Sequence, residues 1–201
     1  MIITDIKPDK KHLTRVYSGE NYLLIDSDIT AELCVGMDIN AEEIKYSSDL
    51  KRAKSRALWL LERMDYTEKK LYEKLITAGF SKKASAEVLS KLCELGLVDD
   101  RRYAERYAAR LMDTNTSKRE AVSKMLGRGI PLELAKEVLA ECDTDEETQI
   151  RNLLEGKYAY KLTRENGSEK VYAALVRKGF SYSAVRSAFK KYIEETEFED
   201  Y

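Results

Sequence analysis

The chain has 201 residues and a formal net charge of -1, and 35% of its residues are charged. One histidine and three widely spaced cysteines exclude a histidine metal cluster and a disulfide framework, and this cysteine usage favours a reducing compartment. The first residues lack the pattern of a secretory signal and no apolar run reaches the roughly 18 residues of a membrane span, so we expect a cytoplasmic protein with no membrane partner.

Residues 1–48 are predicted to form a small N-terminal extension. Two short segments rich in aromatic and branched side chains, 13–17 and 22–25, are joined by a glycine-containing turn and predict a β-hairpin. Two alternatives would support this hairpin. In the first, isoleucines near the start of the chain add a third strand; in the second, the hairpin packs on a short helix over residues 31–35. Asn40 is the expected N-cap of a further helix.

Residues 49–98 are predicted to form a first repeat of three helices. The first helix carries an apolar stripe that Trp59 widens. Thr67 and Ser81 are the expected N-caps of the second and third helices.

Residues 99–142 are predicted to form a second repeat of the same kind. Asp99 or Asp100 caps its first helix, Ser117 and Glu120 form the S-x-x-E pattern of a capping box, and Pro131 suits the first turn of its third helix.

Residues 143–193 are predicted to form a third repeat, with a longer first helix or linker. It opens with an acidic run that suits a helix N-terminus, and Ser168 is the expected cap of its next helix. An acidic tail over residues 194–201 follows.

A glycine recurs every fifty residues, at Gly79, Gly129 and Gly179, and each one follows a similar apolar stripe. A period of this length indicates tandem structural units. We therefore predict a mostly α fold: an elongated tandem array of three three-helix repeats with a small N-terminal β-hairpin extension.

No catalytic motif is present. Phosphate-binding glycine loops are missing, and the Asp99–Asp100 pair reads as a helix cap with first-turn acid. Cys34, Cys93 and Cys142 are expected to be small buried side chains. The sequence predicts a protein that is not an enzyme and that has no cofactor or metal.

The charges are divided along the chain. Residues 51–191 hold thirty basic and twenty-one acidic side chains, whereas residues 1–50 and 192–201 are each acidic by five charges. A basic stretch between acidic ends favours an acidic partner. The predicted partner-binding or nucleic-acid-binding residues are Arg101, Arg102, Arg106, Arg110, Lys118, Arg119, Lys124, Arg128, Lys82 and Lys83.

Tyr103 and Tyr107 could stack on bases, but their helical spacing favours core positions with hydrated hydroxyls.

Two segments, residues 71–81 and 95–104, resemble the RecX family when taken together with the three repeats, and the resemblance covers about residues 49–193. It implies a non-catalytic regulator of the RecA recombinase. Such a regulator binds the RecA–DNA filament and suppresses ATP hydrolysis, strand exchange and coprotease activity. It also implies that residues 97–104 form a junction between the first two repeats.

We expect a monomer whose main partner is the RecA filament, with single-stranded or duplex DNA as a further partner of the basic repeats. The acidic tail is a departure from the family pattern, and we hypothesise that it masks the basic repeats. Two alternatives stay open: a helix-turn-helix-like DNA-binding transcription regulator, and a helical adaptor between proteins.

Overall fold

A computed structural model describes the backbone of residues 1–10 and 12–199 and the side chains up to residue 195. The chain is mostly helical with one small antiparallel sheet, which confirms the predicted fold class. It divides into two compact units, Met1–Asp99 and Asp100–Tyr201.

The first unit begins with a three-stranded antiparallel sheet in the order β1 (Asp5–Pro8), β2 (Leu13–Ser18) and β3 (Asn21–Asp26). Val16 and Ile25 of the sheet and Ile3 before it form a small buried core. The predicted hairpin is confirmed, and the third strand is the alternative that the structure adopts.

The helix predicted over residues 31–35 is wrong. Helix α1 (Ser27–Thr30) forms earlier, because the Asp26 side chain accepts a hydrogen bond from the Asp28 amide and caps it.

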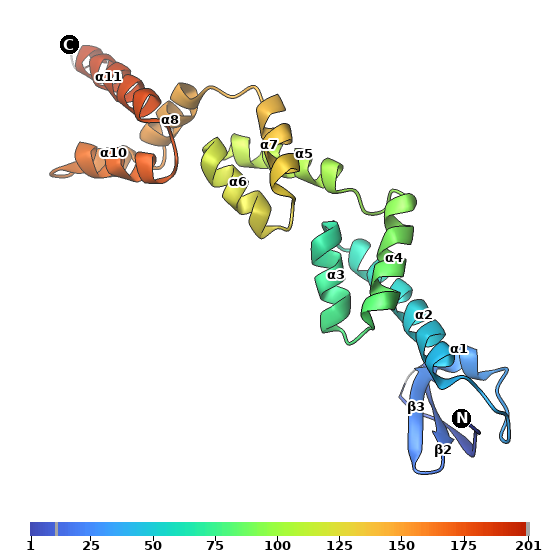
Figure 1. Ribbon diagram of the computed structural model, residues 1–201. Coiled ribbons are helices and arrows are strands. Elements are labelled where there is room, and N and C mark those ends of the chain that lie inside the picture. Colours follow the sequence, from blue (N-terminus) through green and yellow to red (C-terminus); the bar gives the residue numbers. More distant parts are fainter. Residues whose placement is uncertain (11, 200–201) are drawn as a thin grey trace. The chain divides into compact units, whose positions relative to one another are not determined.

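Helix α2 (Ala41–Leu61) connects the sheet to α3 (Glu68–Thr77) and α4 (Lys82–Glu94), as Figure 1 shows. The expected cap is confirmed, because the Asn40 side chain accepts from the amides of the first turn. Ser48, the last residue of the predicted extension, lies inside α2. It accepts a hydrogen bond from the Asp26 amide at 2.8 Å, which fastens the sheet to the helix.

The core of the first unit lies between α2, α3 and α4. It contains Ala53, Ala57, Leu60, Leu71, Leu75, Val88, Leu89, Leu92 and Val98. Thr67 and Ser81 cap α3 and α4 as predicted. Trp59 does not join this core, since 39% of it is exposed, so the prediction that it widens the apolar stripe is wrong.

The second unit contains two helical groups, seen at α5–α7 and α8–α11 in Figure 1. The first is α5 (Asp100–Asp113), α6 (Lys118–Gly127) and α7 (Leu132–Glu141). The second is α8 (Glu146–Glu155), α9 (Ala159–Leu162), α10 (Gly167–Arg177) and α11 (Tyr182–Glu199). Each group encloses its own apolar core.

Ser117 caps α6 as predicted, whereas the cap predicted at Ser168 is wrong. The N-cap is instead Asn166, two residues before Ser168 and in the left-handed conformation, and helix α10 begins at Gly167. A Cβ at Gly167 would lie 2.1 Å from the Lys161 carbonyl oxygen, so only glycine fits where this helix starts.

The three repeated glycines end helices in the same way. Gly79, Gly129 and Gly179 have φ values of 90°, 88° and 96°. The amide after each glycine donates back to a carbonyl five residues earlier: Phe80 to Leu75, Ile130 to Met125 and Phe180 to Leu175. This is the hydrogen-bonding pattern of a left-handed helix stop, which glycine adopts without strain.

The cysteine prediction is only partly correct. Cys93 and Cys142 are half-buried, but Cys34 is exposed, because it lies in the loop that follows α1.

Candidate partner-binding surface

Helix α5 carries four of the predicted binding residues. Arg101 is engaged within the second unit, because its guanidinium is hydrogen-bonded to Glu137 of α7. Two further carboxylates, those of Glu105 and Glu141, lie 3.7 and 3.8 Å from the same guanidinium. The hydrogen bond to Glu137 is the main reason why the pKa of Arg101 is raised. Arg101 therefore fastens α5 to α7, and nearby carboxylates balance its charge.

The other three, Arg102, Arg106 and Arg110, form an exposed row on α5. Their spacing of four residues places them on one side of the helix. The buried side of α5, with Ala104 and Ala108, is opposite. The row therefore faces away from the core of the unit.

Basic side chains also gather along α6. We call Lys118, Arg119 and Lys124 of α6, with Lys178 at the end of α10, the α6 basic cluster. One carboxylate lies among them: Glu120 is 3.0 Å from the Lys124 ammonium and 3.2 Å from that of Lys178. Burial, the largest single influence, raises the pKa of Glu120, but the two lysines together lower it below its ordinary value. Because one carboxylate does not balance four basic side chains, this cluster carries an excess of positive charge.

Several contacts position the α6 basic cluster. The Ser117 hydroxyl accepts from the Glu120 amide at 3.2 Å and donates to the Lys178 carbonyl at 2.6 Å. The Lys118 ammonium donates to the Cys142 carbonyl at 3.1 Å. Because these contacts involve backbone atoms of α6, α10 and the end of α7, the cluster stands on packed elements.

Arg128 lies over a tyrosine pair. Its guanidinium carbon is 5.5 Å from the centre of the Tyr107 ring, and the Tyr103 and Tyr107 rings are 6.2 Å apart. The hydrogen bond to Tyr107 is the main reason why the pKa of Arg128 is raised. Both tyrosines are half-buried against the core of α5–α7, which confirms the prediction that they are core residues.

Lys82 and Lys83 lie in the first unit, in the first turn of α4. The Lys83 ammonium is 4.4 Å from the centre of the Tyr46 ring, and the Tyr46 hydroxyl donates to Glu87. Positive charge at a helix N-terminus opposes the helix dipole, so these lysines do not stabilise α4 through it.

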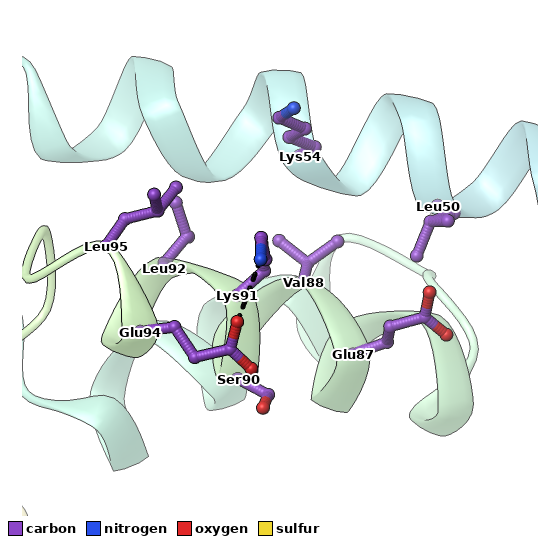
Figure 2. A pocket seen from close by; sticks show the side chains of 9 residues that line it. All are labelled: Leu50, Lys54, Glu87, Val88, Ser90, Lys91, Leu92, Glu94 and Leu95. Carbon is purple, nitrogen blue, oxygen red and sulfur yellow. Dashed lines mark hydrogen bonds and ion pairs between the residues drawn. The ribbon is translucent and has the colours of Figure 1, made fainter.

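The first unit also has a hollow of about 450 Å³ between α2 and α4 (Figure 2). Leu50, Val88, Leu92 and Leu95 form its apolar surface, and Lys91 and Glu94 pair at 2.8 Å on its rim. Lys54, Glu87 and Ser90 complete its lining.

No three His, Cys, Asp or Glu side chains gather where they could hold a metal ion in the part of the chain that the structure describes. Within those same residues, every helix is too short or too polar to cross a bilayer.

Lys178 is the member of the α6 basic cluster that the predicted set omitted. It lies one residue before Gly179, among the basic residues of the third repeat. Its proximity to Glu120 comes from the packing of α10 against the start of α6.

Comparison with known proteins gives one consistent result. The family model described as "RecX, first three-helix domain" matches residues 53–92. A protein of Caldanaerobacter subterraneus subsp. tengcongensis named "Regulatory protein RecX" is 34% identical over 146 residues, covering 69% of this chain and 74% of that one. A protein of the same name from Clostridium tetani is 29% identical over 206 residues, covering 94% and 93%.

Two solved structures share the fold. The "Crystal structure of regulatory protein RecX" matches with a TM-score of 0.66 at 20% identity, covering 94% of this chain and 98% of the other. RecX from Lactobacillus salivarius matches with a TM-score of 0.64 at 25% identity, covering 72% and 97%. The sequence relatives and the shared fold together place the chain in the RecX family of regulatory proteins.

Proposed function

We propose that this protein is a non-catalytic regulator that binds the RecA–DNA filament and inhibits RecA ATPase, strand exchange and coprotease activity. Membership of a family whose members are named regulatory proteins supports a regulatory role. Its partners are the RecA filament and the DNA within it, and it acts in the cytoplasm as a monomer.

The α6 basic cluster is the observation that carries this proposal. Lys124 and Lys178 hold one carboxylate between them, and Lys118 and Arg119 at the start of α6 add to the positive charge. A filament of protein on DNA is an extended polyanion, and neutralising its phosphates releases counterions.

RecA ATPase on single-stranded DNA, measured with and without substoichiometric amounts of this protein, tests the proposal. We expect inhibition that weakens as salt is raised, since phosphate contacts are screened. Unchanged ATPase together with tight binding to one duplex sequence would instead support a transcription regulator. Unchanged ATPase with no nucleic-acid binding at any salt concentration would support a protein adaptor.

Charge reversal identifies the surface. Arg119→Glu with Lys124→Glu is expected to raise the concentration needed for half inhibition by about tenfold or more, because several phosphate contacts are lost together. Lys136→Glu with Lys157→Glu is the matched control, since both lysines are exposed on the same unit outside the α6 basic cluster. Equal effects of the two pairs would show that net charge matters and this surface does not.

A further inference from the structure

One side of α2 in the first unit combines arginines with an exposed indole. Arg52, Arg56, Trp59 and Arg63 follow one another at intervals of four, three and four residues, which places them along one side of a helix. The guanidinium carbons of Arg56 and Arg63 lie 4.3 and 3.5 Å from the centre of the Trp59 ring. That of Arg52 lies 5.6 Å from the centre of the Phe80 ring.

This side of α2 borders a hollow of about 710 Å³. Its other wall comes from the end of the sheet and the loop before β2 and includes Lys10, His12 and Leu13. The acidic residues in the hollow, Asp26 and Asp28, are both engaged by Lys51, at 2.9 Å in the case of Asp26. Positive charge therefore exceeds negative charge in this hollow.

The arginines of this surface are not neutralised. Within the described part of the chain, Arg52, Arg56 and Arg63 make ring contacts and no ion pair. Two guanidiniums against one indole repel each other, and an anion between them would relieve the repulsion. Trp59, 39% exposed, meanwhile leaves apolar ring surface in water.

We propose that Arg52, Arg56, Trp59, Arg63 and Phe80, here called the α2 arginine–aromatic surface, bind a single-stranded nucleic acid. The guanidiniums hold phosphates, and unpaired bases stack on the rings and guanidinium planes. This contact goes beyond the proposed function, because it lies in the first unit and requires no RecA.

Unpaired bases fit this surface better than other polyanions. An acidic peptide would satisfy the guanidiniums but leave the exposed part of the Trp59 ring in water. A duplex keeps its base faces stacked inside the helix, so it offers phosphates and base edges but no free π-face. A single strand supplies both a phosphate chain and free π-faces, which match the alternation of arginine and ring along α2.

Trp59 is the only tryptophan in the chain, so its fluorescence reports on this surface alone. We expect an oligothymidylate of about 12 nucleotides, a length within the usual range of single-strand sites, to quench it saturably without RecA present. Oligouridylate of equal length tells whether the strand is DNA or RNA, and quenching by either supports the proposal. Absence of quenching by both, or equal quenching by polyglutamate or by a duplex, overturns it.

Two variants define the contact. Arg56→Gln with Arg63→Gln should weaken binding by about tenfold or more, because two phosphate contacts are lost. Lys54→Gln with Lys91→Gln is the matched control: these lysines belong to the hollow in Figure 2, which has none of the residues of the α2 arginine–aromatic surface. The control should leave affinity within about twofold at the same salt concentration.

Trp59→Ala tests stacking directly, with binding followed by the anisotropy of a labelled oligonucleotide. We expect about a tenfold loss of affinity, and partial recovery in Trp59→Phe, because a smaller ring still stacks. Unchanged affinity in Trp59→Ala would overturn the proposal. Because RecA is absent from these measurements, they can fail while inhibition of RecA ATPase stands, and the reverse also holds.

Discussion

Gly79 and Gly179 share a backbone conformation and differ in what surrounds them. Both have positive φ, at 90° and 96°. A Cβ at Gly79 would meet open space, whereas one at Gly179 would lie 2.8 Å from the Arg119 Cβ. The Arg119 Cβ is attached directly to the α6 backbone, so it cannot move aside as the end of a side chain could.

Alanine substitution should separate these two effects. Gly79→Ala is expected to lower the free energy of unfolding by about 1 to 2 kcal/mol, through backbone strain alone. Gly179→Ala should lower it by a further 1 to 3 kcal/mol, roughly, because it overpacks the contact with α6. Urea unfolding followed by circular dichroism measures both. Equal losses would mean that α6 and α10 shift apart without resistance.

The helix caps show which residues can be predicted from sequence. Asn40, Thr67, Ser81 and Ser117 are confirmed because a cap is a local arrangement, set by a side chain and the amides two or three residues later. The cap predicted at Ser168 is wrong because Gly167 packs against the carbonyl of a residue six positions earlier. The sequence pattern of helix caps does not reveal that contact.

At the scale of elements, α6 and α10 meet through Glu120, whose lowered pKa links this contact to pH. Since the folded pKa lies below the unfolded one, the ionised carboxylate adds stability above the unfolded pKa of about 4.5. That contribution disappears as pH falls through the folded pKa.

Glu120→Gln should therefore reduce the free energy of unfolding at pH 7 by up to about 1 kcal/mol, since the pair is partly exposed. Once pH falls below the folded pKa of Glu120, which lies below its ordinary value, the two proteins should converge, because the native carboxylate is then protonated as well. Glu133→Gln is the control, since its pair with Lys136 is largely exposed. A difference between wild type and Glu120→Gln that persisted in acid would exclude charge as its cause.

The arrangement of elements was less predictable than their existence. Periodicity predicts the helices of both units. The extension is expected to end at residue 48, but α2 continues through residues 48 and 49. Ser48 accepts a hydrogen bond from the sheet, so the sheet and the helix are joined at this position. The prediction that Trp59 widens the apolar stripe rests on its apolar ring alone, whereas the arginines on the same side of α2 indicate an exposed face. The α6 basic cluster could be predicted only in part, since Lys178 joins it through tertiary packing. The binding role of the ten predicted basic residues and the boundaries of the three repeats stay predictions.

At the scale of the whole molecule, an acidic tail follows the basic stretch of residues 51–191. Residues 200–201 and the side chains of residues 196–199 lie outside the described residues. Before them, Glu195 is 2.8 Å from Arg151 of α8, and Glu194 is 3.7 Å from Lys190. These pairs already join the start of the tail to basic residues of its own unit.

Deleting residues 194–201 should raise affinity for single-stranded DNA several-fold at low salt, because the tail no longer competes for basic side chains. The difference should shrink as ionic strength rises and screens both interactions. A full-length variant with glutamine in place of the tail glutamates separates charge from length. If affinity and salt dependence were both unchanged by the deletion, the masking hypothesis would be wrong.

The Ser117 hydroxyl joins two helices that are synthesised at different times. Its acceptor role at the start of α6 needs only a residue three positions later, but its donor role requires Lys178, sixty-one positions further along the chain. During translation, α6 can therefore be capped before α10 exists, and the second bond forms only when the last repeat emerges. Through this one hydroxyl, the C-terminal helices stabilise the start of a helix that formed earlier. We therefore expect the two helical groups of the second unit to unfold together rather than independently.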